Sequence, residues 1–359
     1  MNDQPGRLMQ AEIAEQPAVL GRIATEAGPA IAEVSAVIAE RRPRFVLLAA
    51  RGSSDHAALY AKYLVEVRLG LPAGLVSPSS MTLYSARPDL RDVLFVAVSQ
   101  SGASPDLVQS LTVAGECGAI TVALTNTPSS QLAQAAEFSL DLRAGVEAAV
   151  AATKSYTAEL LALYLLLAPL AGRSSPAKLA DEAGTLADAA AATLGRDSEV
   201  LAAATRYRFA DRLVTTARGF SYPTAREAAL KLMETSYLGA QAFSGADLLH
   251  GPMAMIHAGL PVIAVVTAGP GGRAMVPVLD RLAERGADLV IVGGAAGPGQ
   301  AALTLPDAVI LPVVTAGVAE ELYPVLEILP LQQFALSLAL QRGANPDAPR
   351  GLSKVTRTC

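Results

Sequence analysis

The sequence predicts an α/β protein built from two copies of one unit, each a parallel β-sheet covered by helices on both faces. Two observations carry this prediction. Uninterrupted apolar runs alternate with segments of helical periodicity, which is the pattern of parallel strands buried on both faces. The tripeptide Ala50-Arg51-Gly52 recurs as Ala217-Arg218-Gly219, at an offset of 167 residues, and later apolar runs end in the same register.

The elements follow in order along the chain. One N-terminal helix is expected from about Met9 to Glu40. The first unit has expected strands at 45–50, 73–76, 93–98, 119–124 and 138–142, with helices at 57–69 and 105–117. A helical stretch over about 147–205 joins the copies. The second unit has expected strands at 212–217, 261–267, 288–292 and 308–314, and then a long helix near 319–342.

These patterns divide the chain into five parts. They are an N-terminal helical segment (1–40), a first domain (41–172), a helical linker (173–205), a second domain (206–342) and a C-terminal tail (343–359). The tail lacks periodicity, so it is either a disordered end or a segment folded over a site.

Composition argues against several classes of protein. A net charge of −5 and an aromatic content of 4% provide no basic, aromatic-rich surface for nucleic acid. The N-terminus lacks the regions of a signal peptide, and the apolar helix Leu160–Ala171 is too short to cross a bilayer. Cys117 and Cys359 have no metal or redox spacing. We therefore expect a cytoplasmic protein that binds neither nucleic acid nor membrane and needs no metal.

The stretch Ser99–Ser104 is the most informative in the chain. It lies between an apolar strand and a helix that begins at Pro105, where backbone N–H groups and the helix dipole favour an anion. Its hydroxyls complete a neutral cradle for a phosphate. Because neither GxxxxGK[ST] nor G-x-G-x-x-G is present, the pattern favours a sugar phosphate over a nucleotide. A serine-rich turn that only caps the helix is the alternative.

The two copies differ at these strand ends. The first copy carries hydroxyl side chains at Ser53, Ser54, Ser99, Ser101, Ser104 and Thr125. The second copy has, in register with them, Phe220, Val266, Ala268, Gly271 and Val292. One copy is therefore expected to hold the anion, while the other contributes different chemistry.

Candidate acid–base groups lie in the second copy. Glu227, Lys231 and Glu234 are spaced i, i+4 and i+7 on an expected helix, so they share one face. Both an exposed ladder of ion pairs and a general base with a cationic neighbour fit this spacing, and the spacing alone slightly favours the ladder. His250 precedes a Gly-Pro pair that would fix its loop, and is a further candidate.

Six motifs in order make the chain resemble the double sugar-isomerase (SIS) domain of glucosamine-6-phosphate synthase over about residues 10–359. The motifs are Gly52-Ser53-Ser54, Ser99–Ser104, Ala151-Ala152-Thr153-Lys154, Glu227-x3-Lys231-x2-Glu234, Leu249-His250-Gly251-Pro252 and Pro349-Arg350-Gly351-Leu352-Ser353-Lys354. The resemblance implies two tandem SIS domains, each a flavodoxin-like three-layer sandwich, and no cofactor. The synthase's glutaminase domain is not expected here, and the segment Ala50–His56 resembles the SIS-type glucosamine-6-phosphate deaminases.

The resemblance also implies which residues bind the substrate. Those that match phosphate-binding positions are Ser54, Ser99, Gln100, Ser101 and Ser104, with Ser53 beside them. Val150 and Ala151 match the backbone that touches the sugar. Ala103 and Leu249 depart from the synthase pattern, where an acidic residue and a lysine are usual, and these departures bear on substrate detail.

The catalytic roles come from the same resemblance. Glu234 matches the base that moves a proton between C1 and C2, with Lys231 nearby. His250 matches a ring-opening histidine that the neighbouring subunit of a homodimer donates. Lys354 matches a tail lysine that contacts the open-chain sugar and can form a Schiff base with a ketose.

The implied activity is deamination of glucosamine 6-phosphate to fructose 6-phosphate and ammonia. Alternatives within the family are a galactosamine-6-phosphate deaminase, a fructosamine-6-phosphate deglycase and an aldose–ketose isomerase. A non-catalytic sugar-phosphate-binding regulator is the alternative of a different class. The apolar helices at 160–170 and 328–340 are expected to leave surface for a homodimer interface.

Overall fold

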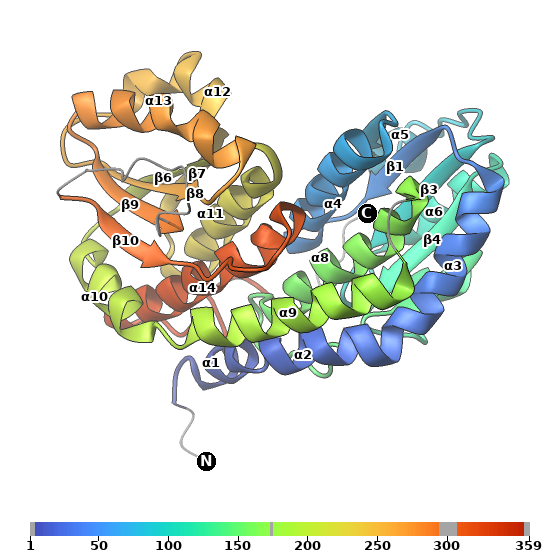
Figure 1. The fold of residues 1–359 in the computed structure, drawn as a ribbon, viewed down its shortest axis with the longest axis horizontal. Helices are drawn as coiled ribbons and strands as arrows, with labels where there is room; N and C mark the ends of the chain where they lie inside the picture. The colour runs from blue at the N-terminus through green and yellow to red at the C-terminus, as the bar shows by residue number, and fades with distance from the viewer. Residues whose placement is uncertain (1–3, 173–174, 294–306, 355–359) are drawn as a thin grey trace. The chain divides into compact units, whose positions relative to one another are not determined.

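The computed structural model describes residues 4–172, 175–293 and 307–354, and the chain forms two compact units (Figure 1). We name each by its strands. The β1–β5 unit comprises Ala18–Glu147, Lys154–Gly184 and Ser353–Cys359, and the β6–β10 unit comprises Met1–Pro17, Ala148–Thr153 and Thr185–Leu352. Both units are therefore assembled from separate stretches of the chain.

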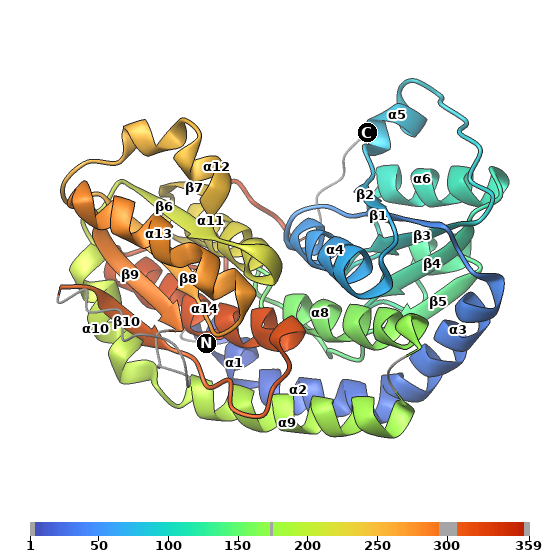
Figure 2. The ribbon, with the colours of Figure 1, turned by 45° about the horizontal axis from the view of Figure 1, so that its top comes forward.

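The β1–β5 unit contains one parallel sheet in the order β2-β1-β3-β4-β5. Its strands are β1 (Phe45–Ala49), β2 (Ala73–Leu75), β3 (Val93–Val98), β4 (Ile120–Thr125) and β5 (Phe138–Asp141). One face packs on α5 (Pro78–Thr82), α6 (Pro105–Glu116) and α7 (Gln131–Ala135). The other face is covered by α3 (Gly28–Arg41), α4 (Ser53–Leu64) and α8 (Lys154–Leu167) (Figure 2).

The β6–β10 unit repeats this plan. Its strands are β6 (Arg212–Ala217), β7 (Gly239–Ser244), β8 (Pro261–Val266), β9 (Asp288–Gly293) and β10 (Val309–Pro312), all parallel in the order β10-β9-β8-β6-β7. One face packs on α12 (Gly245–Leu249) and α13 (Pro270–Glu284), and the other on α10 (Asp197–Tyr207), α11 (Tyr222–Ser236) and α14 (Tyr323–Gln341). Read from the other edge, this is the strand order of the first sheet, so the predicted two-copy α/β fold is confirmed.

The structure departs from the expected elements at the N-terminal helix and at β7. The single helix expected from Met9 to Glu40 is wrong: it is α1 (Arg7–Ala14), α2 (Gln16–Arg22), a π-helical turn at Ile23–Ala27, and α3. Pro29 suits the start of α3, because a proline in the first turn loses no helical hydrogen bond. Strand β7 was not predicted, because Gly-Ala-Gln-Ala-Phe-Ser carries no β-branched residue.

The expectation that α8 and α14 expose apolar surface for a dimer interface is also wrong. Residues 160–167 of α8 are at most 6% exposed, and residues 328–339 of α14 are nearly all buried. Each helix is the middle one on its sheet face, with α3 and α4 beside α8, and α10 and α11 beside α14. Leu340, at 42% exposed, is the exception. The stretch Glu320–Gln341 has the length and apolar composition of a membrane span, but 83% of its most apolar 18-residue window is buried in the protein, as in a core helix.

Candidate functional site

The Ser99–Ser104 segment connects β3 to α6, as the sequence predicts (Figure 2). Gly102 N–H donates to Ser99 Oγ at 3.2 Å, and Ala103 N–H donates to Ser101 Oγ at 3.3 Å. Ser104 is the N-cap of α6, yet its side chain makes no capping hydrogen bond. The alternative of a turn that only caps the helix therefore does not describe Ser104.

Gly102 is required by the shape of this loop. Its φ is +60°, and a Cβ there would collide with the hydroxyl of Ser130 and lie 3.0 Å from Thr125 Oγ1. Leu132 N–H donates to the Gly102 carbonyl at 3.1 Å, which ties the loop to α7. The loop is thus tightly packed against Ser130 and the start of α7, and the hydroxyl groups of Ser99 and Ser101 accept hydrogen bonds from N–H groups of the same loop.

A second loop lies beside the first at the carboxyl edge of the sheet. Because β1 and β3 are paired with Ala49 opposite Ala97, the segments that follow them are neighbours. Ser53 and Ser54 open α4, so their backbone N–H groups belong to its first turn. Ser54 Oγ donates to Glu159 Oε1 at 2.8 Å in the protein interior. The Ser54 hydroxyl proton is therefore committed to Glu159, and what Ser54 offers an anion is its backbone N–H.

The Ser54 hydroxyl has a counterpart that the sequence comparison of the two copies overlooked. Ser221, 167 residues later, donates to Glu327 Oε1 at 2.7 Å, and Thr224 and Thr267 also donate to Glu327. Burial raises the pKa of Glu327, although these hydroxyl groups oppose the shift. A serine bonded to a buried glutamate thus occurs in both copies, which makes it part of the scaffold rather than of one ligand site.

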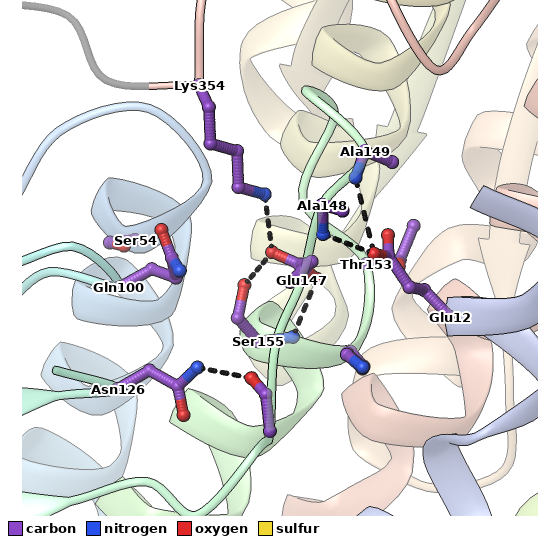
Figure 3. Close-up of polar contacts among 12 residues, drawn as sticks. Glu12, Ser54, Gln100, Asn126, Glu147, Ala148, Ala149, Thr153, Ser155 and Lys354 are labelled. Atoms are coloured by element: carbon purple, nitrogen blue, oxygen red, sulfur yellow. Dashed lines mark hydrogen bonds and ion pairs between the residues drawn. The ribbon is translucent and has the colours of Figure 1, made fainter. Parts of the chain in front are cut away.

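Lys354 of the C-terminal tail is held by Glu147, a residue that the sequence analysis did not single out (Figure 3). Lys354 Nζ lies 2.9 Å from Glu147 Oε2, and Ser155 donates to the same carboxylate from its backbone N–H (3.0 Å) and its hydroxyl (2.6 Å). The Glu147 side chain is completely buried, whereas Lys354 is 25% exposed. Burial disfavours the ionised carboxylate, but Lys354 and Ser155 outweigh it and lower the pKa of Glu147.

The tail is folded, not disordered, over residues 343–354. Asp347 accepts from Leu8 N–H (3.1 Å) and Met9 N–H (2.8 Å), and Arg350 N–H donates to Tyr237 Oη at 3.0 Å. The Arg350 guanidinium lies 4.0 Å from the centre of the Tyr237 ring. Residues 355–359, with Cys359, lie outside the described residues. The tail thus runs past Tyr237, three residues beyond Glu234.

Glu227, Lys231 and Glu234 form a buried ion-paired group on α11. Lys231 Nζ lies 2.6 Å from Glu234 Oε2 and 3.3 Å from Glu227 Oε1. Glu227 and Lys231 are at most 1% exposed, and Glu234 is 22% exposed. Burial alone would lower the pKa of Lys231, but the two carboxylates raise it above its ordinary value. The alternative of an exposed ladder of ion pairs is therefore wrong, because this face of α11 packs against the interior.

The remaining predicted residues of this unit lie on its loops. His250 follows α12 and is exposed, as is Leu249 before it. Val150 N–H donates to the Asp347 carbonyl at 3.2 Å, and Ala151 is 1% exposed. Ala148 and Ala149 donate through their N–H groups to Glu12 Oε1 (Figure 3). Glu12 on α1 thus anchors the backbone segment that the resemblance assigns to sugar contact.

The structure sorts the predicted site residues into two groups. Those in the β1–β5 unit are Ser53, Ser54, Ser99, Gln100, Ser101, Ser104 and Lys354. Those in the β6–β10 unit are Val150, Ala151, Lys231, Glu234 and His250. Over the described parts of the chain, no three His, Cys, Asp or Glu side chains group as metal ligands. The first group combines the hydroxyl and backbone N–H groups of two loops with a fixed ammonium, and the second contains a carboxylate paired with a buried lysine.

Comparison with known proteins places this geometry in a family. The SIS domain model matches residues 41–169 and 207–338. The glutamine–fructose-6-phosphate aminotransferase (isomerizing) of Gloeobacter violaceus is 34% identical over 96% of this chain, and the match covers 58% of that enzyme. The chain thus spans less than three fifths of the length of this relative.

Solved structures agree with the match. A provisionally assigned phosphosugar isomerase from Silicibacter pomeroyi has a TM-score of 0.84 at 35% identity, with 95% of this chain and 99% of that one aligned. A glucosamine-6-phosphate deaminase from Thermotoga maritima has a TM-score of 0.77 at 22% identity, covering 98% and 100%, and this likeness concerns the fold. The chain belongs to the SIS family of sugar-phosphate isomerase proteins, with two tandem SIS domains homologous to those of the glutamine–fructose-6-phosphate aminotransferases.

Proposed function

We propose that this chain deaminates a 2-amino-2-deoxyhexose 6-phosphate, with glucosamine 6-phosphate as substrate, to fructose 6-phosphate and ammonia. The observation that carries the proposal is the ion-paired group on α11. Glu234 is the partly exposed end of a buried Glu-Lys-Glu chain, so a carboxylate is fixed beside an ammonium at the protein surface. A carboxylate held in this way suits proton transfer between neighbouring carbon atoms, which requires no metal.

The proposed reaction has three steps. His250, donated by the second subunit of a homodimer, opens the pyranose ring, and the phosphate is bound by the Ser99–Ser104 loop and the first turn of α4. Glu234 removes the proton at C2 of the open-chain aldehyde while the aldehyde oxygen gains a proton, which gives an enolamine. Glu234 then returns its proton to C1 while the amino group gives up one proton, which yields an imine at C2. Water adds to this imine, and the C–N bond breaks to release ammonia and the ketose.

Lys354 is assigned to the open-chain sugar in this proposal. Glu147 fixes the ammonium group of Lys354 in the unit that carries the serine-rich loops. A positive charge that is held in place stabilises oxyanions formed at the sugar carbonyl. The folded tail also supports a role in excluding water from reactive open-chain intermediates.

The decisive experiment measures ammonia and ketose 6-phosphate together over a panel of amino-hexose phosphates, including the galacto epimer and a fructosamine 6-phosphate. Glu234→Gln should abolish both ammonia release and solvent-proton exchange at C2, while inorganic phosphate still binds. Glu284→Gln, the same change in an exposed ion pair of α13, is the matched control. Exchange at the wild-type rate in Glu234→Gln would show that another group is the base.

The other family members are distinguished by the same panel. Ketose formation without ammonia would identify an aldose–ketose isomerase, and turnover of only the galacto or glycated substrate would redirect the assignment. Binding without any turnover would identify a regulator. Subunit exchange between inactive His250→Ala and Glu234→Gln proteins tests the homodimer: one site of each mixed dimer would receive both defects and the other neither, so activity near half per heterodimer is expected.

A further inference from the structure

Arg51 lies in the loop that joins β1 to α4, just before Ser53 and Ser54, and is not among the residues that the family resemblance assigns. It follows β1 and directly precedes Gly52, the N-cap of α4. Its guanidinium pairs with Asp106 in the first turn of α6, with Nη2 at 2.6 Å and Nε at 2.9 Å from Oδ2. One side chain therefore spans from the end of β1 to the start of the helix that follows the Ser99–Ser104 loop.

The strand register places Arg51 level with Ser99. Ala49 and Ala97 are paired across β1 and β3, and Arg51 and Ser99 each lie two residues beyond them. The side chains of Gly52–Ser54 and of Ser99–Ser104 carry no positive charge. Arg51 thus brings a guanidinium, paired with Asp106, to an edge of the sheet where the two loops themselves offer hydroxyl, amide and backbone N–H groups.

The surroundings of Asp106 fix its carboxylate in place for the ion pair with this guanidinium. Asp106 is 5% exposed, and its other oxygen, Oδ1, accepts the Leu107 N–H at 2.9 Å. The Arg51 side chain, in contrast, remains 45% exposed. A free surface arginine loses about 2 kcal/mol of rotamer entropy when it is fixed on a ligand. Asp106 removes much of this cost in advance, which is preorganisation for binding.

We propose that Arg51 is a phosphate-binding residue, positioned by Asp106, that selects phosphorylated sugars over neutral ones. The proposal deepens the function proposed above and rests on it. Guanidinium and phosphate match in geometry and charge, because a planar fork of N–H donors can face two phosphate oxygens at once. The half-exposed position of Arg51 leaves donors that a ligand in the cradle can reach.

The test is the affinity for inorganic phosphate, measured by titration calorimetry, and the KM for glucosamine 6-phosphate. Arg51→Ala should weaken both by about tenfold, the effect of one partly screened charged contact. Arg51→Lys should recover part of the loss because it keeps the charge. Binding of unphosphorylated glucosamine should not change. Arg87→Ala is the matched control, because Arg87 pairs with Glu116 at the opposite end of α6.

A double variant separates phosphate binding from stabilisation of the fold. Arg51→Gln combined with Asp106→Asn removes both charges, so no buried carboxylate is left unpaired. Phosphate affinity should stay low in this variant if Arg51 binds phosphate, and recovery to the wild-type value would overturn the inference. Ser101→Ala reports on the site itself. If Ser101→Ala weakens phosphate binding and Arg51→Ala does not, the inference alone fails; if neither does, the proposed phosphate site fails with it.

Discussion

Replacing Glu147 by Gln should release the tail lysine while leaving the fold intact. The change conserves volume at a completely buried position. The new amide can still accept from Ser155, but it removes the negative charge that Lys354 Nζ meets at 2.9 Å. A hydrogen bond between charged groups contributes about 1.5–3 kcal/mol. Lys354 is only 25% exposed, so most of that value should apply here.

The expected effect on activity follows from this magnitude. Loss of about 2 kcal/mol corresponds to a fall of about thirtyfold in kcat/KM if fixing Lys354 matters for the reaction. The free energy of unfolding should also depend on pH because of the Glu147–Lys354 ion pair. The folded-state pKa of Glu147 lies below its ordinary value of 4.5, so the stabilisation is present above pH 4.5 and is lost as pH falls through the folded-state pKa. In urea unfolding, the Glu147→Gln variant should not show this loss of stability at acid pH.

A double-mutant cycle gives the sharpest assay. Glu147→Gln and Lys354→Met should each lower kcat/KM, and the combined variant should be little worse than Lys354→Met alone, since both changes remove one pair. Ser155→Ala, which removes the hydroxyl bond but keeps both charges, should have a smaller effect. Hydrogen exchange at residues 349–354 should rise in Glu147→Gln. The reasoning would be refuted if the effects of Glu147→Gln and Lys354→Met on the free energy of activation were additive. Unchanged hydrogen exchange at residues 349–354 in Glu147→Gln would refute it as well.

Two further predictions concern the loops and the core. Gly102→Ala should destabilise the protein by about 2 kcal/mol and weaken phosphate binding, because its φ is positive and the new Cβ would collide with Ser130. Gly115→Ala in α6 is the control, because the nearest atom to its Cβ would be 3.7 Å away, and it should be neutral or stabilising. Thermal unfolding measures both variants. Glu327→Gln tests the raised pKa of this buried carboxyl group. As pH rises from 4.5 through the folded-state pKa, the wild type should lose stability relative to the variant, because its native state must then bury a charge. Urea unfolding between pH 4 and 8 compares the two proteins, and a difference that is constant with pH would contradict it.

The fold could be predicted because each predicted strand is a continuous apolar run that neighbouring residues in the sequence delimit. The apolar run that ends at Val98 and the serine loop behind it are contiguous in sequence, so the strand, turn and helix all follow from neighbouring residues. Glu147 and Arg51 could not be found in this way. Glu147 acquires its role from Lys354, which is 207 residues away, and Arg51 from Asp106, which is 55 residues away. An acidic residue in an otherwise apolar loop, and an arginine directly before a glycine N-cap, were the available signals.

The burial of the α11 group was likewise beyond the sequence. Charges at i, i+4 and i+7 describe a shared helix face but not its direction. The direction is set by α14, which packs along α11, and by Thr235 on α11, whose hydroxyl lies 3.5 Å from the Ala335 carbonyl of α14. Apolar α8 and α14 were misread for the same reason, since an apolar helix suits a core and an interface equally well.

The division of the chain into interleaved stretches has a consequence for folding. Residues 148–153 belong to the β6–β10 unit, although both flanking stretches belong to the β1–β5 unit, and the tail returns to the β1–β5 unit at Ser353. A ribosome that has released the first 172 residues has therefore not yet made Lys354, so the cationic partner of Glu147 is missing until the chain reaches residue 354. Contacts between residues far apart in the sequence slow folding, because a long loop must close before they can form. A fragment cut at residue 172 should therefore keep the hydrogen bonds from Ser155 to Glu147 but lack the ammonium group of Lys354 that pairs with this carboxylate.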